Sequence, residues 1–437
     1  MARPASFLLA RVGGVSRRLL LRACISRALT IALSSIALVT LTGAIPALAQ
    51  TEPPPADDAP LAGLSQADLR ALAPELERGP VLHAIFRPDS REVPEIALAV
   101  RVNAPAARVA EIVASPEHYP TFMPALDEIA IESRDGAQIA YRWKWNVALF
   151  TLTGRNTMTV FPGHPTRGHR IEVRSTGGDM GRGRISWRIT PDGPERCTLV
   201  VAMRLDMRDA NYLADQLASG GIAVQRSINV VMATVMALGT RQRAERGAPS
   251  DRPLGELTRP AFDPARLASL LERGDLVFLE LDGNRLARVA VAGRMGTGLE
   301  RTRAVMNDPE EFGRSLVFGS TAQVVERTES DVVFEWGIPM PLVGIEGRMR
   351  LRPSDAVVAV DGVSGSLRSG QWRFDTHVAP HGEAIVFGWA RFDPAEASRL
   401  VRRLIADDHS FSHGLAIATQ VMIVRSLRQR ALGYSPG

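Results

Sequence analysis

The chain has 437 residues and a formal net charge of +5, with 52 basic and 47 acidic residues. Six arginines and no acidic residue precede residue 50; without those six charges the net charge of +5 becomes −1, so the high pI does not indicate nucleic-acid binding. Of the two cysteines only Cys197 lies outside that segment, which excludes an internal disulfide there and leaves stability to packing.

The first 49 residues have the pattern of a secretory signal peptide. An apolar run at 28–45 follows the arginines, and the sequence Ala-Leu-Ala at 47–49 is typical of a cleavage site. We therefore expect residues 1–49 to be removed on export to the periplasm or cell envelope. Arg17 and Arg18 leave the twin-arginine route open beside the general one, and the length of the apolar run leaves an uncleaved membrane anchor open.

The next elements predict a flexible segment followed by an antiparallel domain. Residues 50–74 begin with a Pro-rich stretch and are expected to form a flexible tether. A strand at 96–102, a turn at 103–105 and a helix at 106–115 open the domain. Strand-like runs bounded by Asp-Gly, Pro-Gly and Gly-Gly pairs then predict a meander, at 128–133, 139–154, 156–161, 169–175, 183–190 and 197–206.

A long helix is predicted to close this domain. It begins at Asp209 and is expected to bend or break at Gly220-Gly221. Apolar residues spaced by three and four form one stripe after the break, at Val224, Ile228, Val231, Val235 and Leu238. Because nothing else in the domain covers the sheet, we expect this stripe to lie across the concave face of a curved sheet.

The pattern from residue 75 onward is repeated about 190 residues later. Leu76-Glu77-Arg78-Gly79 recurs at 271–274, and the Pro-Glu pair and aromatic residue of 116–119 recur at 309–312 in the same order. A period of this length predicts two copies of one domain and not a solenoid. We assign 75–245 to the first domain, the Pro-rich stretch 246–262 to a linker and 263–437 to the second domain, and the oligomeric state stays open.

The strand, turn and helix at 96–115, followed by Tyr119-Pro120 and Phe122, resemble the START-like (SRPBCC) superfamily of polyketide cyclase, coenzyme Q-binding and lipid-transfer proteins. The resemblance covers about 91–245 and, through the repeat, about 285–433. It implies an α+β fold with two tandem helix-grip domains, each a curved antiparallel sheet wrapped on a long C-terminal helix. It also implies an apolar cavity between sheet and helix, and it carries no catalytic motif.

Aromatic and apolar residues near the implied cavity are the candidate ligand-binding residues. Tyr141, Trp143 and Trp145 alternate onto one face of a strand, where they either line a cavity or pack as core beneath a helix. The turn at 115–124 places apolar side chains at the cavity mouth, unless they fill the core. The candidate set is Tyr119, Phe122, Met123, Tyr141, Trp143, Trp145, Val231 and Val235 in the first copy and Phe312, Trp336 and Trp389 in the second.

The second copy departs from the first at two of these points. Gly296-Thr297-Gly298 stand in place of Asn103-Ala104-Pro105. Trp389 has no aromatic counterpart, because the repeat sets it against Met203 or Arg204 of the first copy. We therefore expect a different pocket in the second copy.

These features favour an exported, non-enzymatic carrier or sensor of a hydrophobic small molecule such as a lipid, sterol, quinone or polyketide. Two alternatives stay open: a cyclase or dehydratase that uses Arg101, Glu128 or Lys144 in the cavity, and a structural module with collapsed cavities that docks a partner. No catalytic residue, cofactor or metal is predicted, because His409 and His413 are interpreted as a solvated helix start. Transient contact of the turn at 115–124 with a membrane is a further expectation.

Overall fold

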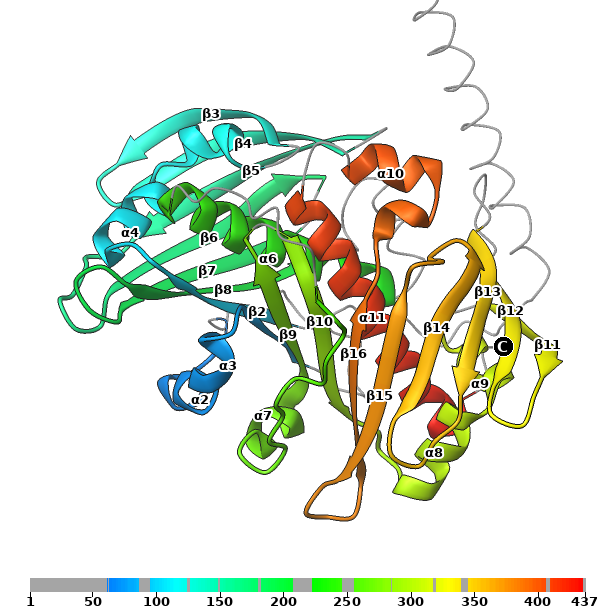
Figure 1. Cartoon of the computed structure of the whole chain (residues 1–437). Helices are drawn as coiled ribbons and strands as arrows, with labels where there is room; N and C mark the ends of the chain where they lie inside the picture. Colours follow the sequence, from blue (N-terminus) through cyan, green and yellow to red (C-terminus); the bar gives the residue numbers. More distant parts are fainter. Residues whose placement is uncertain are drawn as a thin grey trace, which may run out of the picture. The chain divides into compact units, whose positions relative to one another are not determined.

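The computed structural model describes residues 61, 63–85, 95–123, 126–147, 150–179, 182–206, 222–245, 255–283, 285–316, 320–338, 345–405 and 409–434 (Figure 1). The predicted signal peptide, its cleavage site and Gly220-Gly221 lie outside the described residues. Within the described ranges, no helix combines the length and the apolar character needed to cross a membrane.

Within the described residues, sixteen strands form one continuous antiparallel sheet that carries both copies (Figure 1). Its strand order is β11-β12-β13-β14-β15-β16-β10-β9-β1-β2-β8-β7-β6-β5-β4-β3, so each copy contributes eight strands in the same relative order. The strands of the first copy are β1 (Val81–Ile85), β2 (Ile96–Val102), β3 (Leu126–Asp135), β4 (Gln138–Val147), β5 (Phe150–Val160), β6 (His169–Gly178), β7 (Arg182–Pro191) and β8 (Cys197–Asp206). Those of the second copy are β9 (Gly274–Asp282), β10 (Arg285–Arg294), β11 (Thr321–Arg327), β12 (Val332–Ile338), β13 (Ile345–Arg352), β14 (Val358–Gly365), β15 (Gln371–Val378) and β16 (Ala384–Arg391).

The predicted meander of the first copy is confirmed, with one correction. The runs at 139–154 and 156–161, expected as two strands, are divided at another point: β4 ends at Val147, and β5 takes the end of the first run together with the second. The two strands pair with Tyr141 opposite Asn156. The sequence gives no break signal between the two strands, because Ala148 and Leu149 are apolar and are neither Gly, Pro, Asn nor Asp.

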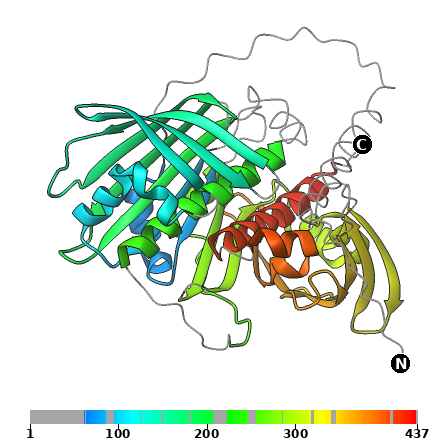
Figure 2. The ribbon, with the colours of Figure 1, turned by 90° about the horizontal axis from the view of Figure 1, so that it is seen from above.

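Each copy packs one long helix against the sheet (Figure 2). This helix is α6 (Ile222–Glu245) in the first copy, on β2 and β8, and α11 (His409–Ala431) in the second, on β10 and β16. The shorter helices are α2 (Gln66–Ala71), α3 (Ala73–Leu76), α4 (Ala106–Ala114), η1 (Pro116–Thr121), α7 (Ala268–Arg273), α8 (Leu299–Asn307), α9 (Pro309–Arg314), η2 (Pro394–Glu396) and α10 (Arg399–Ile405). The predicted α+β fold with two tandem helix-grip domains is confirmed.

The expectation of a flexible tether through residue 74 is wrong at its C-terminal end, where α2 and α3 form. Ser65 and Asp68 build a capping box, in which the Ser65 hydroxyl accepts from the Asp68 N–H and the Asp68 carboxylate accepts from the Ser65 N–H. Asp68 forms an ion pair with Arg273 at 2.5 Å, and Glu75 forms one with Arg266 at 2.6 Å. These two short helices therefore belong to the folded structure and contact the second copy.

Strands β1 and β9 join the two copies edge to edge. They pair antiparallel, with Leu82 opposite Val277. These two residues are 195 positions apart, as are Leu76 and Leu271 of the repeated motif, so they are equivalent residues of the two copies. Equivalent residues that face each other are typical of an isologous dimer interface, here built within one chain.

Apolar side chains cover both faces of the middle of the sheet. On one face they form the core beneath α6 and α11, and on the other they form a second core with α2, α3 and α7. Phe262, at the end of the predicted linker, stacks on Phe387 with ring centroids 4.3 Å apart, and Arg259 binds Asp375 at 2.6 Å. The end of the predicted linker is therefore packed against the second copy.

Candidate functional site

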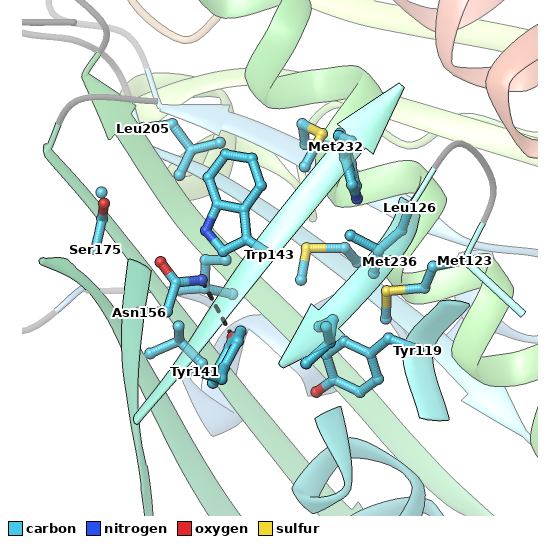
Figure 3. Close-up of a pocket in the computed structure, with 15 residues that line it drawn as sticks. Tyr119, Met123, Leu126, Tyr141, Trp143, Asn156, Ser175, Leu205, Met232 and Met236 are labelled. Carbon is cyan, nitrogen blue, oxygen red and sulfur yellow. Dashed lines mark hydrogen bonds between the residues drawn. The ribbon is translucent and has the colours of Figure 1, made fainter. Parts of the chain in front are cut away.

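An apolar cavity lies between the sheet and α6 of the first copy (Figure 3). Its volume is about 70 Å³. A cavity needs roughly 10–15 Å³ to hold one water molecule, so this one has room for several. The lining residues are Tyr119, Met123, Leu126, Ile129, Tyr141, Trp143, Trp145, Asn156, Val173, Ser175, Gly183, Ile185, Leu205, Met232 and Met236.

Strand β4 supplies the aromatic wall of the cavity. Tyr141, Trp143 and Trp145 all face it, as predicted, whereas Lys144 points to the other side and pairs with Asp127 at 3.3 Å. The Trp143 indole lies over Gly154, its partner in β5, where an added Cβ would stand 2.2 Å from the ring. Glycine at this position therefore makes the room that the indole occupies in the cavity wall.

The polar groups that line the cavity are neutral. The Tyr119 hydroxyl donates to the Val113 carbonyl oxygen at 2.5 Å, and the Tyr141 hydroxyl oxygen accepts from Asn156 Nδ2 at 3.1 Å (Figure 3). Burial raises the pKa of Tyr141 to about 12 and raises the pKa of Tyr119 well above its ordinary value. Both hydroxyls therefore stay protonated near neutral pH, and neither serves as a base.

The three residues considered for catalysis lie outside this cavity. Arg101 forms ion pairs with Glu77 at 3.1 Å and Asp192 at 2.6 Å. Glu128 and Lys144 line an open hollow on the outer face of the sheet instead. Among the described residues that line the cavity there is no carboxylate, imidazole, ammonium or guanidinium group.

The prediction that the stripe with Val231 and Val235 faces the sheet is wrong. An added Cβ on Gly414 of α11 would stand 3.1 Å from Val231 Cγ1, and Val235 is buried one turn further along the same side of α6. The cavity is lined from α6 by Met232 and Met236 instead. Because α6 lies between the sheet and α11, two of its faces are apolar, and spacing alone does not show which one meets the sheet.

Asn229 fixes the orientation of α6. Its Oδ1 accepts from the Leu205 N–H at 2.8 Å, and its Nδ2 donates to the Leu205 carbonyl at 3.0 Å. Met232 and Met236 follow at spacings of three and seven, so they share the face of Asn229. Asn229 therefore turns the side of α6 that carries Met232 and Met236 toward the sheet.

The turn after α4 closes one end of the cavity. Tyr119 and Met123 line it and are only 3% exposed, so the expectation that they form an accessible apolar rim is wrong. Phe122 does not line it; its ring packs edge-on against Tyr119 at 5.7 Å, next to Gly239 of α6. The buried Tyr119 and Met123 thus offer no surface to a membrane.

Comparison with known proteins agrees with this geometry. Residues 94–228 match the model of the family described as polyketide cyclase / dehydrase and lipid transport. This segment is a START-like domain. The resemblance that the residues predicted is therefore confirmed, and with it a fold that binds hydrophobic ligands.

Solved structures with START-like folds are similar to the chain at low identity. They include the Zhui aromatase/cyclase from Streptomyces sp. R1128, 22% identical over 35% of this chain and 93% of that chain, with a TM-score of 0.30. Human STARD10 is 14% identical over 41% of this chain and 80% of its own, with a TM-score of 0.31. The di-domain ARO/CYC StfQ from the steffimycin biosynthetic pathway is 12% identical over 75% and 98%, with a TM-score of 0.26. No curated protein matches the sequence.

In the second START-like copy, aromatic rings pack against one another in the core beneath α11. Phe312 is 1% exposed, and its ring meets Phe374 at 5.5 Å and Phe334 at 6.4 Å between centroids. Trp336 is buried in the same core. Phe312 and Trp336, both predicted to bind a ligand, therefore have the surroundings of core residues. The amide of Gln420 on α11 is also buried here, without a hydrogen-bond partner.

The prediction that Trp389 lines a cavity is wrong. It belongs to the core on the face of the sheet opposite α11. It pairs across the sheet with Arg373, as Val200 pairs with Arg188 in the first START-like domain. Its counterpart is therefore Val200, three or four positions before the expected Met203 or Arg204, and the shift comes from the drifting length of the repeat.

The strand register shows which residues of the two START-like copies correspond. Tyr141 pairs with Asn156 between β4 and β5, and Phe334 pairs with Met349 between β12 and β13. The offset is 193 in every case, as it is for the repeated turn. The corresponding positions are Tyr119 and Phe312, Tyr141 and Phe334, Trp143 and Trp336, Gly154 and Gly347, and Asn156 and Met349.

Histidines supply no metal site in the part of the chain that the structure describes. No group of three or more His, Cys, Asp or Glu residues lies close enough together there to hold a metal ion. His413 is 7% exposed within α11, so the interpretation of a solvated helix start is wrong for it, and the side chain of His409 lies outside the described residues.

Proposed function

We propose that this protein is an exported, non-enzymatic carrier or sensor that holds a hydrophobic small molecule in the cavity of its first START-like domain. The observation that carries the proposal is the chemistry of the cavity lining, which is aromatic and aliphatic with a few neutral hydrogen-bonding groups. Burial of apolar ligand surface, at about 25 cal/mol per Å², then supplies most of the affinity. Lipids, sterols, quinones and polyketides are the ligand classes with this character.

The cavity must widen to accept a ligand of that size. Its volume of about 70 Å³ lies well below the roughly 300–1,000 Å³ of common ligand pockets. Met232 and Met236 form the α6 side of the cavity, and unbranched methionine side chains change shape at low cost. On this proposal, ligand entry moves these side chains and leaves the sheet in place.

An enzyme of cyclase or dehydratase type has less support. The described residues that line the cavity include no group that exchanges a proton near neutral pH, because the two tyrosine hydroxyls have raised pKa values and the other polar lining groups are amide, hydroxyl and indole. Cys197 offers no nucleophile either, since burial raises the pKa of its thiol to about 12. Binding without chemistry is therefore the better account of this lining.

The second copy has a supporting role on this proposal. Its interior is packed with aromatic rings, its strand β9 continues the sheet from β1, and its helix α11 packs on α6. These contacts hold α6, and hence the cavity wall, from the side that does not face the ligand. On this proposal the predicted signal peptide directs the protein to the periplasm or cell envelope, where apolar ligands need a carrier through water.

The proposal is tested on full-length protein produced with its own N-terminal segment in a Gram-negative host. The protein is recovered from the periplasmic fraction without detergent, weighed by native mass spectrometry and extracted with organic solvent. We expect one apolar molecule per chain. A protein that stays in the cytoplasm contradicts export, and a mass without adduct after incubation with envelope lipids contradicts the carrier.

Two equivalent tryptophans give matched variants for the same measurement. Trp143→Ala removes part of the cavity wall and should lower the occupancy of the ligand about tenfold, which corresponds to about 1.4 kcal/mol. Trp336→Ala removes the corresponding core residue of the second copy and should lower the melting temperature while the adduct persists. Equal loss of adduct in both variants, or in neither, would contradict a binding site in the first cavity.

A further inference from the structure

We propose that the Tyr141 hydroxyl and the Trp143 indole N–H recognise one neutral acceptor oxygen, a ketone or ester carbonyl, on an otherwise apolar ligand. This inference rests on the proposed function and specifies the ligand that the cavity selects. Two observations support it. Two hydrogen-bond donors lie on one wall of the cavity, and the second copy has apolar residues where the first copy has Tyr141 and Asn156.

The first donor is the hydroxyl of Tyr141. Its oxygen accepts the hydrogen bond from Asn156 Nδ2 at 3.1 Å, so its own proton is available to an acceptor in the cavity. Tyr119 has the opposite arrangement, because its proton is spent on the Val113 carbonyl oxygen at 2.5 Å. Of these two buried hydroxyls, only Tyr141 is arranged to donate to a ligand.

The second donor is the indole of Trp143. Its Nε1 is buried and has no hydrogen-bond partner among the residues that the structure describes, and the indole lines the cavity. Figure 3 shows this nitrogen turned to the side of the cavity where Asn156 and Ser175 lie. Trp143 and Tyr141 are two positions apart on one strand face, about 7 Å along β4, so a ligand oxygen between them approaches both donors.

An unpartnered indole does not by itself single out Trp143. Buried indole nitrogens without a partner also occur on Trp187, Trp336, Trp372 and Trp389. Trp143 differs from its equivalent Trp336 in having the cavity and the Tyr141–Asn156 pair beside it. The site is therefore defined by the two donors together.

The second copy shows that the fold does not require these polar groups. Phe334 and Met349 occupy the positions of Tyr141 and Asn156, in the same strand register. Apolar replacement of both partners of a buried polar pair is nearly neutral or stabilising, and the second copy has apolar residues at both positions. Its retention in the first copy therefore points to a ligand oxygen.

The lining residues also favour a neutral ligand over a charged one. A carboxylate in the cavity would find no cationic side chain among the lining residues, and a cation would find no carboxylate. Burial of an unpaired charge costs far more than burial of a neutral carbonyl that accepts hydrogen bonds. The site therefore favours a ketone or ester over an acid or amine of the same shape.

A pair of small probes of one shape tests the inference on the full chain. Acetophenone carries a carbonyl where ethylbenzene carries a methylene, so the two probes differ little in shape. Their affinities are measured by isothermal titration calorimetry for the wild type and for Tyr141→Phe. For each probe, the affinity for the variant is compared with the affinity of the same probe for the wild type. The two probes are not compared with each other, because they differ in the free energy of their hydration.

Tyr141→Phe should weaken acetophenone up to about tenfold, the worth of one neutral hydrogen bond, and leave ethylbenzene within about twofold. Tyr119→Phe is the matched control: it also removes a hydroxyl from the cavity wall, and both affinities should then move together. Thermal melts of both variants verify that they fold.

The outcomes separate this inference from the function on which it rests. If Tyr141→Phe changes both affinities equally, the cavity binds apolar molecules and the carbonyl recognition is wrong. If neither probe binds the wild type, the inference is overturned together with the proposed cavity. If benzoate binds the wild type more tightly than acetophenone, the preference for a neutral oxygen is wrong.

Discussion

The two START-like copies share strand order and register but differ in their interiors. At the five corresponding positions the aromatic Trp143 and Trp336 are kept, as are the glycines that oppose them in the next strand. The polar side chains differ: Tyr119, Tyr141 and Asn156 of the first copy are replaced by apolar residues in the second. The residues that both copies share therefore serve the fold. The polar residues found in the first copy alone indicate a role beyond folding for the interior of that copy.

The two interiors differ in their packing: aromatic rings pack against one another in the second copy, whereas the first copy contains a cavity. Three phenylalanine rings meet edge to face in the second copy, an arrangement that adds to the energy of burial. In the first copy a cavity of about 70 Å³ remains between the sheet and α6. The atoms that line an unfilled cavity lack dispersion contacts on one side, so the cavity lowers the stability of the first copy.

The packing of the second interior is tested by Phe334→Ala, which has the largest expected effect. Phe334 is fully buried, so loss of its ring should lower the free energy of unfolding by about 3–5 kcal/mol. Urea unfolding followed by circular dichroism measures the change. Val325→Ala is the control in the same copy, because Val325 is 43% exposed and its loss should shift the midpoint little. A cost below about 1 kcal/mol for Phe334→Ala would mean that this interior is not packed.

His83 lies at the junction of the two copies, and the second copy has a different residue at the equivalent position. We expect this histidine to make the stability of the protein depend on pH. It is fully buried in β1; its Nε2 lies 3.1 Å from the Leu270 carbonyl, and its Nδ1 has no partner. Burial above all, with the charge of Arg273, lowers the pKa of His83 from 6.5 to about 4, against the opposing effect of Asp68 and Asp275. A proton on Nδ1 would add a donor with no acceptor.

The sign of the effect follows from the two states. Between pH 6.5 and about 4 the unfolded chain binds a proton at His83 that the folded chain refuses, so stability falls as the pH falls through this window, by about 3 kcal/mol in total. His83→Gln keeps a donor near the position of Nε2 and does not titrate. Unfolding at pH 7 and pH 4.5 should show a smaller loss for the variant than for the wild type, and equal losses would show that His83 is not the group responsible.

Alternation and turn residues predicted most of this fold, because strands with one buried face repeat every two residues. They placed β2 within its observed bounds and set Tyr141, Trp143 and Trp145 on one face. They failed between β4 and β5, where Ala148 and Leu149 give no break signal. They also failed at α2 and α3: Ser65 and Asp68 have the spacing of a capping box, but the contacts that hold these helices on the second copy are long-range.

The cavity was predictable from its strands and not from its helix. Val231 and Val235 have the spacing of a core stripe, but that stripe meets α11, which the sequence of one copy does not show. Trp389 was misplaced because a drifting repeat was aligned without the strand register. Asn156 and Ser175 were missed because small polar residues in a strand alternate without a distinctive pattern.

The smallest expected effect comes from giving the first copy the residues of the second. Tyr141→Phe alone leaves the Asn156 amide without its acceptor and should cost about 1–3 kcal/mol of stability. The double variant Tyr141→Phe with Asn156→Met removes both partners and should return to within about 1 kcal/mol of the wild type, since apolar replacement of a whole pair is nearly neutral.

Urea unfolding of the two single variants and the double variant completes a double-mutant cycle for this pair. The coupling should be favourable, so that the second substitution repairs the first. A double variant that is less stable than both single variants would mean that the pair holds the first copy together, and that its absence from the second copy is compensated elsewhere. Recovery of stability in the double variant would instead show that the fold does not need the Tyr141–Asn156 pair. Recognition of a ligand oxygen would then explain why the first copy has it.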